Sequence, residues 1–200
     1  MAKKKQRARP SPEKRRDELL RAFEAWTSQR GGLADVDSVR LLLDFRSDYL
    51  DSNLACWRAS DLSHLLLGLF PRKVVLDAEE VADIVPAAGA FLHFMAATGR
   101  LDAGSDPLEE LDEELEEIEE AFPEAMSDRD AFGMAKALAM AMEAEGVDIT
   151  DPSALQAWIG EFNARPEAER RAMVPDAEAA FGPPGRVSLP EDIPIPPVRI

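Results

Sequence analysis

The chain has 200 residues, of which 46% are hydrophobic and 31% charged, and its net charge is −16. This composition is typical of a globular protein that buries a core, and it excludes a chain that stays unfolded along its whole length. The single cysteine, Cys56, excludes an internal disulfide framework and is typical of a reducing compartment, so we expect a cytoplasmic protein. We find no apolar run near the roughly 20 residues that a membrane-spanning helix needs, and the basic start lacks the apolar stretch of a signal peptide, so no membrane partner is expected.

The chain begins with a basic arm, residues 1–10. Residues 1–16 carry eight Lys or Arg against one acid, a local charge of +7, which leaves −23 for the remainder. Because an acidic body repels nucleic acid at long range, we expect any nucleic-acid contact to come through the arm alone. The candidate contact residues are Lys3, Lys4, Lys5, Arg7 and Arg9.

The first two predicted helices follow the arm. Ser11 is a good N-cap with Pro12 at the first helical position, and the glycine pair that starts at Gly31 ends this helix. A second helix is predicted over residues 38–50, where apolar side chains recur at helical spacing.

A third helix is predicted from the N-cap Ser60 to Phe70, because Pro71 interrupts a helix. Arg72 and Lys73 follow directly. Cations at this place are favoured by the exposed carbonyls of the helix end, which is a sufficient structural reason for them. The alternative is a contact with a phosphate or an acidic peptide, and we therefore keep both as candidate partner-binding residues.

Two short helices are predicted next, over residues 77–85 and from Pro86 to Gly99. The second contains His93, which we expect to be a core histidine bonded to a carbonyl. Neither His93 nor His64 stands three residues after a glutamate, and no Cys/His cluster has the spacing of a zinc site. The sequence therefore predicts no metal site and no cofactor.

An acidic segment occupies residues 105–125. Its apolar residues are three or four positions apart, which predicts an amphipathic helix with a buried stripe of Leu108, Leu111, Leu115, Ile118 and Phe122. Thirteen acids and no base lie between Arg100 and Arg129, so no ion pair within the helix relieves their repulsion. Two interpretations stay open: a solvated face, or a docking surface for a basic partner or for the chain's own arm. The candidate partner-binding residues are Glu113, Glu116, Glu117 and Glu120.

A helix is predicted over residues 127–146 with Ser127 as its N-cap, and its part from Phe132 to Met142 is apolar almost all round, which is typical of a central buried helix. Its methionines alternatively form an adaptable surface for a partner. Within it, we expect Lys136 to reach the surface or to pair with an acid.

The last predicted helices are shorter. Asp151 and Pro152 repeat the cap-then-proline pattern and predict a helix that stops before Pro166. A further short helix is predicted over residues 167–173. Residues 181–200 are rich in proline and are predicted to be extended.

Between Leu41 and Leu101 the chain combines Trp57, the apolar helix Leu62–Phe70, "PRKV" at Pro71–Val74, and "VP" at Val85–Pro86 before an "AFLHF" helix. This combination resembles a segment of uncharacterised helical proteins from high-GC Gram-positive bacteria. The resemblance implies a helical fold and a bacterial cytosolic setting, and it brings no activity with it.

Together these patterns predict an all-α fold: a compact, bundle-like domain over residues 11–180, with a lobe boundary near 101–106, between the basic arm and a tail at 181–200. No phosphate-binding glycine loop, nucleophile elbow or H-E-x-x-H motif is present. We therefore expect a non-enzymatic protein-interaction or regulatory protein that uses the acidic helix face or the Met-rich surface. The alternatives are a nucleic-acid-associated protein that binds through the arm, and an enzyme with no recognisable motif.

Overall fold

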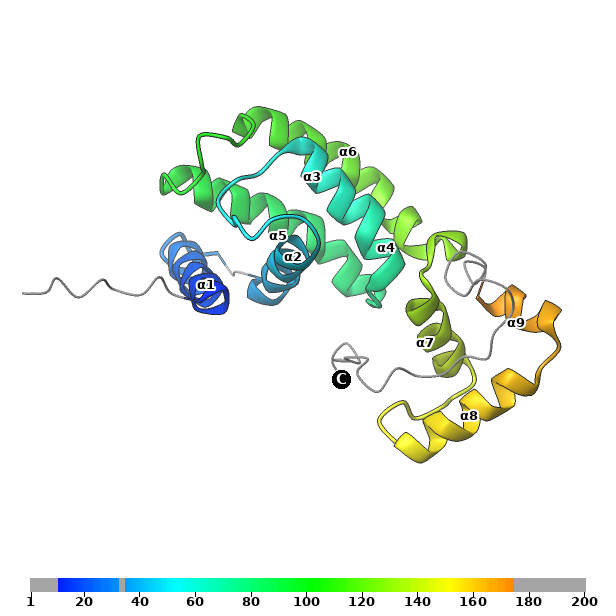
Figure 1. Ribbon diagram of the computed structural model, residues 1–200. Coiled ribbons are helices and arrows are strands. Elements are labelled where there is room, and N and C mark those ends of the chain that lie inside the picture. Colours follow the sequence, from blue (N-terminus) through cyan, green and yellow to red (C-terminus); the bar gives the residue numbers. More distant parts are fainter. Residues whose placement is uncertain (1–10, 33–34, 175–200) are drawn as a thin grey trace, which may run out of the picture. The chain divides into compact units, whose positions relative to one another are not determined.

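The structure is a computed structural model that describes residues 11–32 and 35–174. Within these ranges the chain forms helices, turns and loops and no β-strand, which confirms the all-α prediction (Figure 1). The chain divides into two compact units, Met1–Leu66 with Ala78–Phe122 and Leu67–Asp77 with Pro123–Ile200. Residues 101–106, where the sequence placed a lobe boundary, therefore lie inside the first unit.

The first unit contains the long helices of the described chain. These are α1 (Pro12–Ser28), α2 (Val36–Tyr49), α5 (Ala78–Ala97) and α6 (Leu108–Ser127). The short helix α3 (Ala59–Ser63) and the start of a π-helical segment, His64–Leu69, lie between α2 and α5 in the sequence. Helix α6 passes the unit boundary after Phe122 and ends in the second unit.

The second unit contains shorter elements. They are α4 (Phe70–Lys73), a 3₁₀ turn (Arg129–Ala131), α7 (Met134–Ala144), α8 (Pro152–Ala164) and α9 (Glu167–Met173). The tail at residues 181–200 and the domain limits near residues 10 and 180 fall outside the described ranges, so those predictions stay predictions.

Helix α5 supplies much of the core of the first unit. Its Phe91 ring is fully buried and lies 5.7 Å from Phe23 of α1 and 6.0 Å from Trp57, measured between centroids. Among the described helices, α5 alone is long and apolar enough to cross a membrane by length and composition. Eight of its side chains are buried in the unit, and this core position is a sufficient reason for its apolar composition.

A buried arginine connects α2 to the loop that follows it. Arg46 is 1% exposed, pairs with Asp61 at 3.1 Å, and donates to the carbonyl of Cys56. Its guanidinium also lies 4.5 Å from the ring centroid of Trp57. The charge is thus balanced by an acid, a carbonyl and an aromatic face, as burial of an ion requires.

The beginning of α3 is held by residues from the loop before α6. The carboxylate of Asp106 accepts from the backbone N–H of Ala59 at 2.9 Å, and the Ser105 hydroxyl accepts from the N–H of Trp57 at 3.0 Å. The prediction that Ser60 caps this helix is wrong, because the N-cap position belongs to Arg58, two residues earlier, and the first donor of the helix is satisfied by Asp106. The two ends of the sequence segment 59–106 are therefore fastened together.

Besides Pro12 and Pro152 at first helical positions, three prolines lie further inside helical segments, and two of the predicted helix boundaries are wrong for this reason. Pro71 lies inside α4 and does not end the helix, Pro86 lies in the middle of α5 and does not begin one, and Pro123 lies inside α6. The π-helical segment His64–Leu69 comes directly before α4. Its wider turn changes which carbonyl faces the ring of Pro71, so the chain continues helically through the proline.

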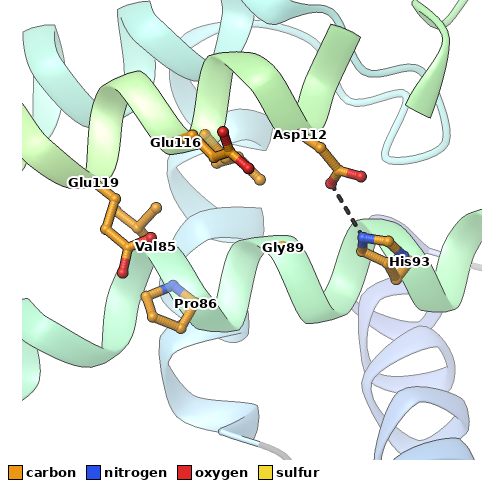
Figure 2. A pocket seen from close by; sticks show the side chains of 8 residues that line it. Val85, Pro86, Gly89, His93, Asp112, Glu116 and Glu119 are labelled. Carbon is orange, nitrogen blue, oxygen red and sulfur yellow. Dashed lines mark hydrogen bonds and ion pairs between the residues drawn. The ribbon is translucent and has the colours of Figure 1, made fainter. Parts of the chain in front are cut away.

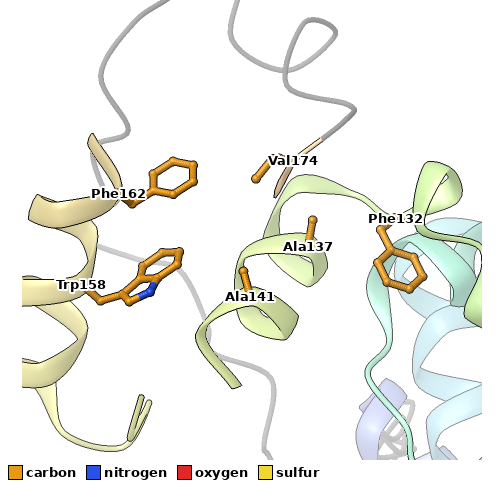
Figure 3. Packing of buried hydrophobic residues seen from close by; sticks show 6 residues of the cluster. All are labelled: Phe132, Ala137, Ala141, Trp158, Phe162 and Val174. Atoms are coloured by element: carbon orange, nitrogen blue, oxygen red, sulfur yellow. The ribbon is translucent and has the colours of Figure 1, made fainter. Parts of the chain in front are cut away.

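Helix α8 packs a pair of stacked rings against α7 in the second unit (Figure 3). Trp158 and Phe162 lie 5.2 Å apart at 17° and share a buried cluster with the small residues Ala137 and Ala141 of α7. The large apolar residues of α7 are only half-buried: they are Met134, Leu138, Met140 and Met142. The prediction of a fully buried central helix is therefore wrong, because α7 turns mainly small side chains toward this small core.

Lys136 lies inside this unit rather than at its surface. It is 4% exposed, its Nζ donates to the Met126 carbonyl at 3.3 Å, and it lies 4.0 Å from the centroid of the Phe132 ring. The expectation of a surface position or an acidic partner is wrong for the part of the chain that the structure describes. The Met126 carbonyl belongs to the last turn of α6, where a cation is favoured by the helix dipole.

Two of the four predicted N-caps are confirmed, and both stand directly before a proline. Ser11 accepts from the N–H of Lys14 at 3.3 Å and Asp151 accepts from Ser153 at 2.8 Å, each before a proline at the first helical position. Gly31 and Gly99 take positive φ angles of 74° and 64° just after helices, as predicted. Ser127, by contrast, is the last residue of α6 and not an N-cap: its hydroxyl donates to the Glu124 carbonyl at 2.9 Å, and α7 begins after Gly133.

Candidate interaction site on an acidic helix

Helix α6 is fixed to the first unit by its predicted apolar stripe. Leu111, Leu115, Ile118 and Phe122 are all at most 6% exposed, whereas Leu108 at the start of the helix is half-buried. Because the stripe occupies one side, it sets which acids face outward. The buried side also receives a polar contact, since the Ser63 hydroxyl donates to the carboxylate of Glu114.

The outward side of α6 is a continuous row of glutamates, which we call the acidic face: Glu109, Glu110, Glu113, Glu116, Glu117, Glu119 and Glu120. All seven are exposed, and they include the four predicted partner-binding glutamates. Among the described residues, no Lys or Arg forms an ion pair with any of them. Their mutual repulsion is therefore reduced only by water, by salt ions and by any cationic ligand that binds there.

A groove of about 290 Å³ lies between α5 and α6 (Figure 2). Its lining residues come from both helices: Val85, Pro86, Gly89, His93, Asp112, Leu115, Glu116 and Glu119. The helices run in opposite directions, so Val85 and Glu119 share one end of the groove and His93 and Asp112 the other. The floor is thus apolar and the α6 edge carries three carboxylates.

Gly89 lies at the middle of the groove, where the two helices approach each other. A Cβ atom at this position would lie 3.6 Å from the Leu115 methyl carbon, an ordinary van der Waals distance. The missing side chain therefore leaves an open space of one methyl group above Leu115, which deepens the groove.

His93 closes one end of this groove and corrects the sequence prediction. Its side chain is 53% exposed, and its Nε2 lies 3.1 Å from the carboxylate of Asp112. The expectation of a core histidine bonded to a carbonyl is therefore wrong. In α5 the buried positions belong to neighbours such as Phe91 and Leu92, which leaves residue 93 on the outer side of the helix.

Arg72 and Lys73 do not belong to the unit that contains this site. Both are exposed in the last turn of α4, which belongs to the second unit. The backbone carbonyl of Arg72 accepts from the N–H of Gly133 at 2.9 Å. A Cβ at residue 133 would lie 2.7 Å from that oxygen, so only glycine permits this contact between α4 and the start of α7.

All four of the shifted pKa values in the described chain lie in the second unit, those of Lys136, Glu145, Asp148 and Arg165. Burial lowers the pKa of Lys136 to about 8. The pKa of Glu145 is lowered mainly by its bond from Arg165, which binds both carboxylate oxygens at 2.8 Å, and also by a 2.7 Å bond from Trp158. These contacts join the end of α7 to α8 and have a structural role.

Sequence reasoning found the acidic face but missed the groove. The signal on α6 was present, because Asp112, Glu116 and Glu119 follow one another at helical spacing. The wall formed by α5 could not be predicted, because the sequence placed a helix start at Pro86 and so assigned Val85 and His93 to different helices. The arm candidates Lys3, Lys4, Lys5, Arg7 and Arg9 lie outside the described residues, and nucleic-acid binding stays a prediction.

Among the residues that the structure describes, no group of three or more His, Cys, Asp or Glu side chains has the arrangement of a metal site. No family model, no curated protein and no solved structure matches this chain. Function must therefore be argued from the site itself, and the resemblance to bacterial helical proteins stays a prediction.

Proposed function

We propose that this is a protein-interaction or regulatory protein, without catalytic activity of its own, that binds a basic segment of another protein on the acidic face of α6. The observation that carries the proposal is the set of seven exposed glutamates on one rigid helix, with no cation from the described chain paired to them. Complementary charge increases the rate of encounter and selects basic partners over acidic ones.

The buried stripe of α6 supports a role in binding. Leu111 and Ile118 are fully buried, so the glutamates between them have fixed directions relative to the unit. A partner then meets a surface that is already formed, and the loss of conformational entropy on binding is limited to side chains. The groove beside α5 adds apolar contact that a purely charged surface lacks.

The half-buried methionines of α7 offer a second surface of the kind predicted from sequence. Their flexible side chains adapt to partners of different shape. They belong to the second unit and already pack against the cluster of Trp158 and Phe162. We therefore place the principal binding role on α6.

The test is affinity purification from the native host with three versions of the protein. The unmodified protein is expected to retain a basic partner, and a variant with four charge reversals to Lys on the acidic face is expected to lose it; the reversed residues are Glu113, Glu116, Glu117 and Glu120. The matched control reverses four exposed acids of α1 and α2, which are Glu13, Glu18, Glu24 and Asp48, and should retain the partner.

Circular dichroism of all three versions establishes that the helices are preserved. Retention of the same partner by the α6 variant would contradict the proposal, and so would a purification in which nothing binds the unmodified protein. Because both variants change the net charge equally, a loss seen in both would indicate a non-specific charge effect.

A further inference from the structure

The carboxylates at the edge of the groove have a regular spacing. Asp112, Glu116 and Glu119 all line it, and they stand four and three residues apart on α6. A helix rises about 1.5 Å per residue, so these positions are separated by about 6 Å and about 4.5 Å along the axis. The row is therefore suited to a ligand with cationic groups at intervals of about 4.5–6 Å, which long Lys and Arg side chains also reach from slightly wider backbone spacings.

The chain carries such a ligand in its own arm. Lys3, Lys5, Arg7 and Arg9 occupy every second position. In an extended chain, alternate side chains lie on the same side and repeat at about 6.6 Å. In a helix the same four residues would point in different directions, and Pro10 disfavours a helical conformation for Arg9.

We propose that the basic arm, residues 3–9, binds in extended form along the groove between α5 and α6 and so competes with partners for the acidic face. Its cations would meet Asp112, Glu116 and Glu119, and their methylene stems would cover the exposed ring of Pro86. The binding itself requires no partner protein, and only its regulatory consequence rests on the proposed function.

The arm is the occupant favoured by connectivity as well as by charge. Helix α1, which follows the arm, belongs to the same unit as the groove, and its Phe23 contacts Phe91 and Phe94 of α5. Ten extended residues reach up to about 33 Å from Ser11. A tethered segment also has an effective concentration in the millimolar range, which compensates for weak individual pairs.

Individual ion pairs at an exposed edge contribute about 0.2–1 kcal/mol each and are screened by salt. The arm therefore binds loosely enough for a partner with a longer basic segment to replace it. A partner should then bind more tightly to protein that lacks residues 1–10, because the competing cations are gone.

The direct test is zero-length carbodiimide coupling of the purified protein, which joins an amine to a carboxylate only when the two are in contact. The sample is an equal mixture of unlabelled and ¹⁵N-labelled chains, analysed by mass spectrometry. We expect bonds within a single chain between Lys3, Lys4 or Lys5 and the acids that line the groove, and their loss in about 1 M NaCl, where the screening length falls to about 3 Å.

Two variants locate the contact. Replacing Glu116 and Glu119 by Gln should remove most of the coupling, whereas replacing Glu113 and Glu117, which do not line the groove, should preserve it. Circular dichroism checks that both fold. Products that join a labelled to an unlabelled chain would overturn the proposal, because the arm would then bind a second copy. The proposal would also be overturned if the unmodified protein showed no coupling, or if the two variants coupled to the same extent.

The result is independent of the proposed function. If the arm couples to the groove but no partner is retained in the affinity purification, the inference stands and the proposed function fails. If a partner is retained through α6 but the arm does not couple, the proposed function stands and the inference fails.

Discussion

A single buried guanidinium, that of Arg46, holds together three parts of the first unit: α2, the loop after it, and the start of the next helical segment. The planar fork reaches Asp61 and the Cys56 carbonyl while its face lies over Trp57. A lysine has no fork and cannot stack in this way. Arg46→Lys should therefore lower the free energy of unfolding by about 2–3 kcal/mol, less than the roughly 3–5 kcal/mol of breaking a buried ion pair, because lysine keeps the positive charge.

Chemical denaturation measures this loss, with Arg21→Lys on the exposed side of α1 as the control. The control should change stability by less than about 0.5 kcal/mol, as expected for a surface site. Equal effects of the two substitutions would show that the buried contacts of Arg46 add nothing to stability.

Lys136 makes the stability of the second unit depend on pH. Burial lowers its pKa from 10.5 to about 8 in the folded state. Between these values the unfolded chain binds more protons than the folded chain, so stability rises with pH from about 8 to about 10.5 and the full penalty of about 3 kcal/mol applies below pH 8. In Lys136→Met this rise should disappear.

The measurement is the free energy of unfolding at about pH 7.5 and about pH 10, values that lie on either side of the shifted pKa. Lys73→Met, which removes an exposed lysine of the same unit, should respond to pH like the unmodified protein. A Lys136→Met variant that gains as much stability at high pH as the unmodified protein would contradict the prediction.

Residue-scale features that depend on near neighbours were predictable from sequence, and those that depend on distant ones were not. Ser11 and Asp151 cap helices that begin beside them, so the pattern contains all the relevant information. Ser60 was predicted to cap α3, but the N–H of Ala59 is bonded by Asp106, which lies 47 residues away in the sequence. His93 likewise contacts Asp112, which lies on another helix.

At the scale of the element, α6 is a helix whose exposed side is under electrostatic strain. Glu113 and Glu117 are four residues apart, where like charges destabilise a helix by about 0.2–0.5 kcal/mol. Glu117→Lys replaces this repulsion by an attraction in the favourable orientation. It should stabilise the protein by about 0.5–1 kcal/mol at low ionic strength.

Thermal unfolding at low salt and at about 1 M NaCl tests this origin, because surface charge effects are largely screened at the higher concentration. Glu117→Gln, which removes the repulsion without adding attraction, should gain about half as much. A stabilisation that is unchanged by salt would point to helix propensity instead of charge.

The elements also show why the helix boundaries predicted at prolines were wrong. Local rules place a helix end at Pro71 and a helix start at Pro86, because a proline removes one hydrogen bond and crowds the preceding turn. In the structure the apolar residues beside these two prolines are buried: Phe70 before Pro71, Val85 before Pro86 and Ala87 after it. Burial of such side chains contributes more than the lost bond costs, so the helix continues.

At the scale of the whole molecule, the two units have separate clusters of buried aromatic residues, which predicts separate responses to core mutations. Phe91→Ala should destabilise the first unit and Phe162→Ala the second, each by about 3–5 kcal/mol. Tryptophan fluorescence reports each unit when only Trp57 or only Trp158 is retained. Each core mutation is expected to shift the midpoint of its own reporter by the larger amount.

Equal shifts of both reporters by either mutation would contradict this and indicate a single cooperative unit. The division could not be found from sequence because two of the three unit boundaries fall inside helical segments, after Leu66 and after Phe122, where composition does not change. A lobe boundary was expected instead at residues 101–106, whose glycine and polar residues are typical of a linker but serve here to fasten α3.

The lack of basic residues around α6 has a practical consequence for protein chemistry. Trypsin cleaves after lysine and arginine, and the chain offers neither between Arg100 and Arg129. A digest therefore releases the acidic face intact within one peptide, residues 101–129, while residues 1–16 are cut into very short fragments. Every adduct formed on the acidic face, whether from a partner or from the arm, will appear as a mass increase on that one peptide.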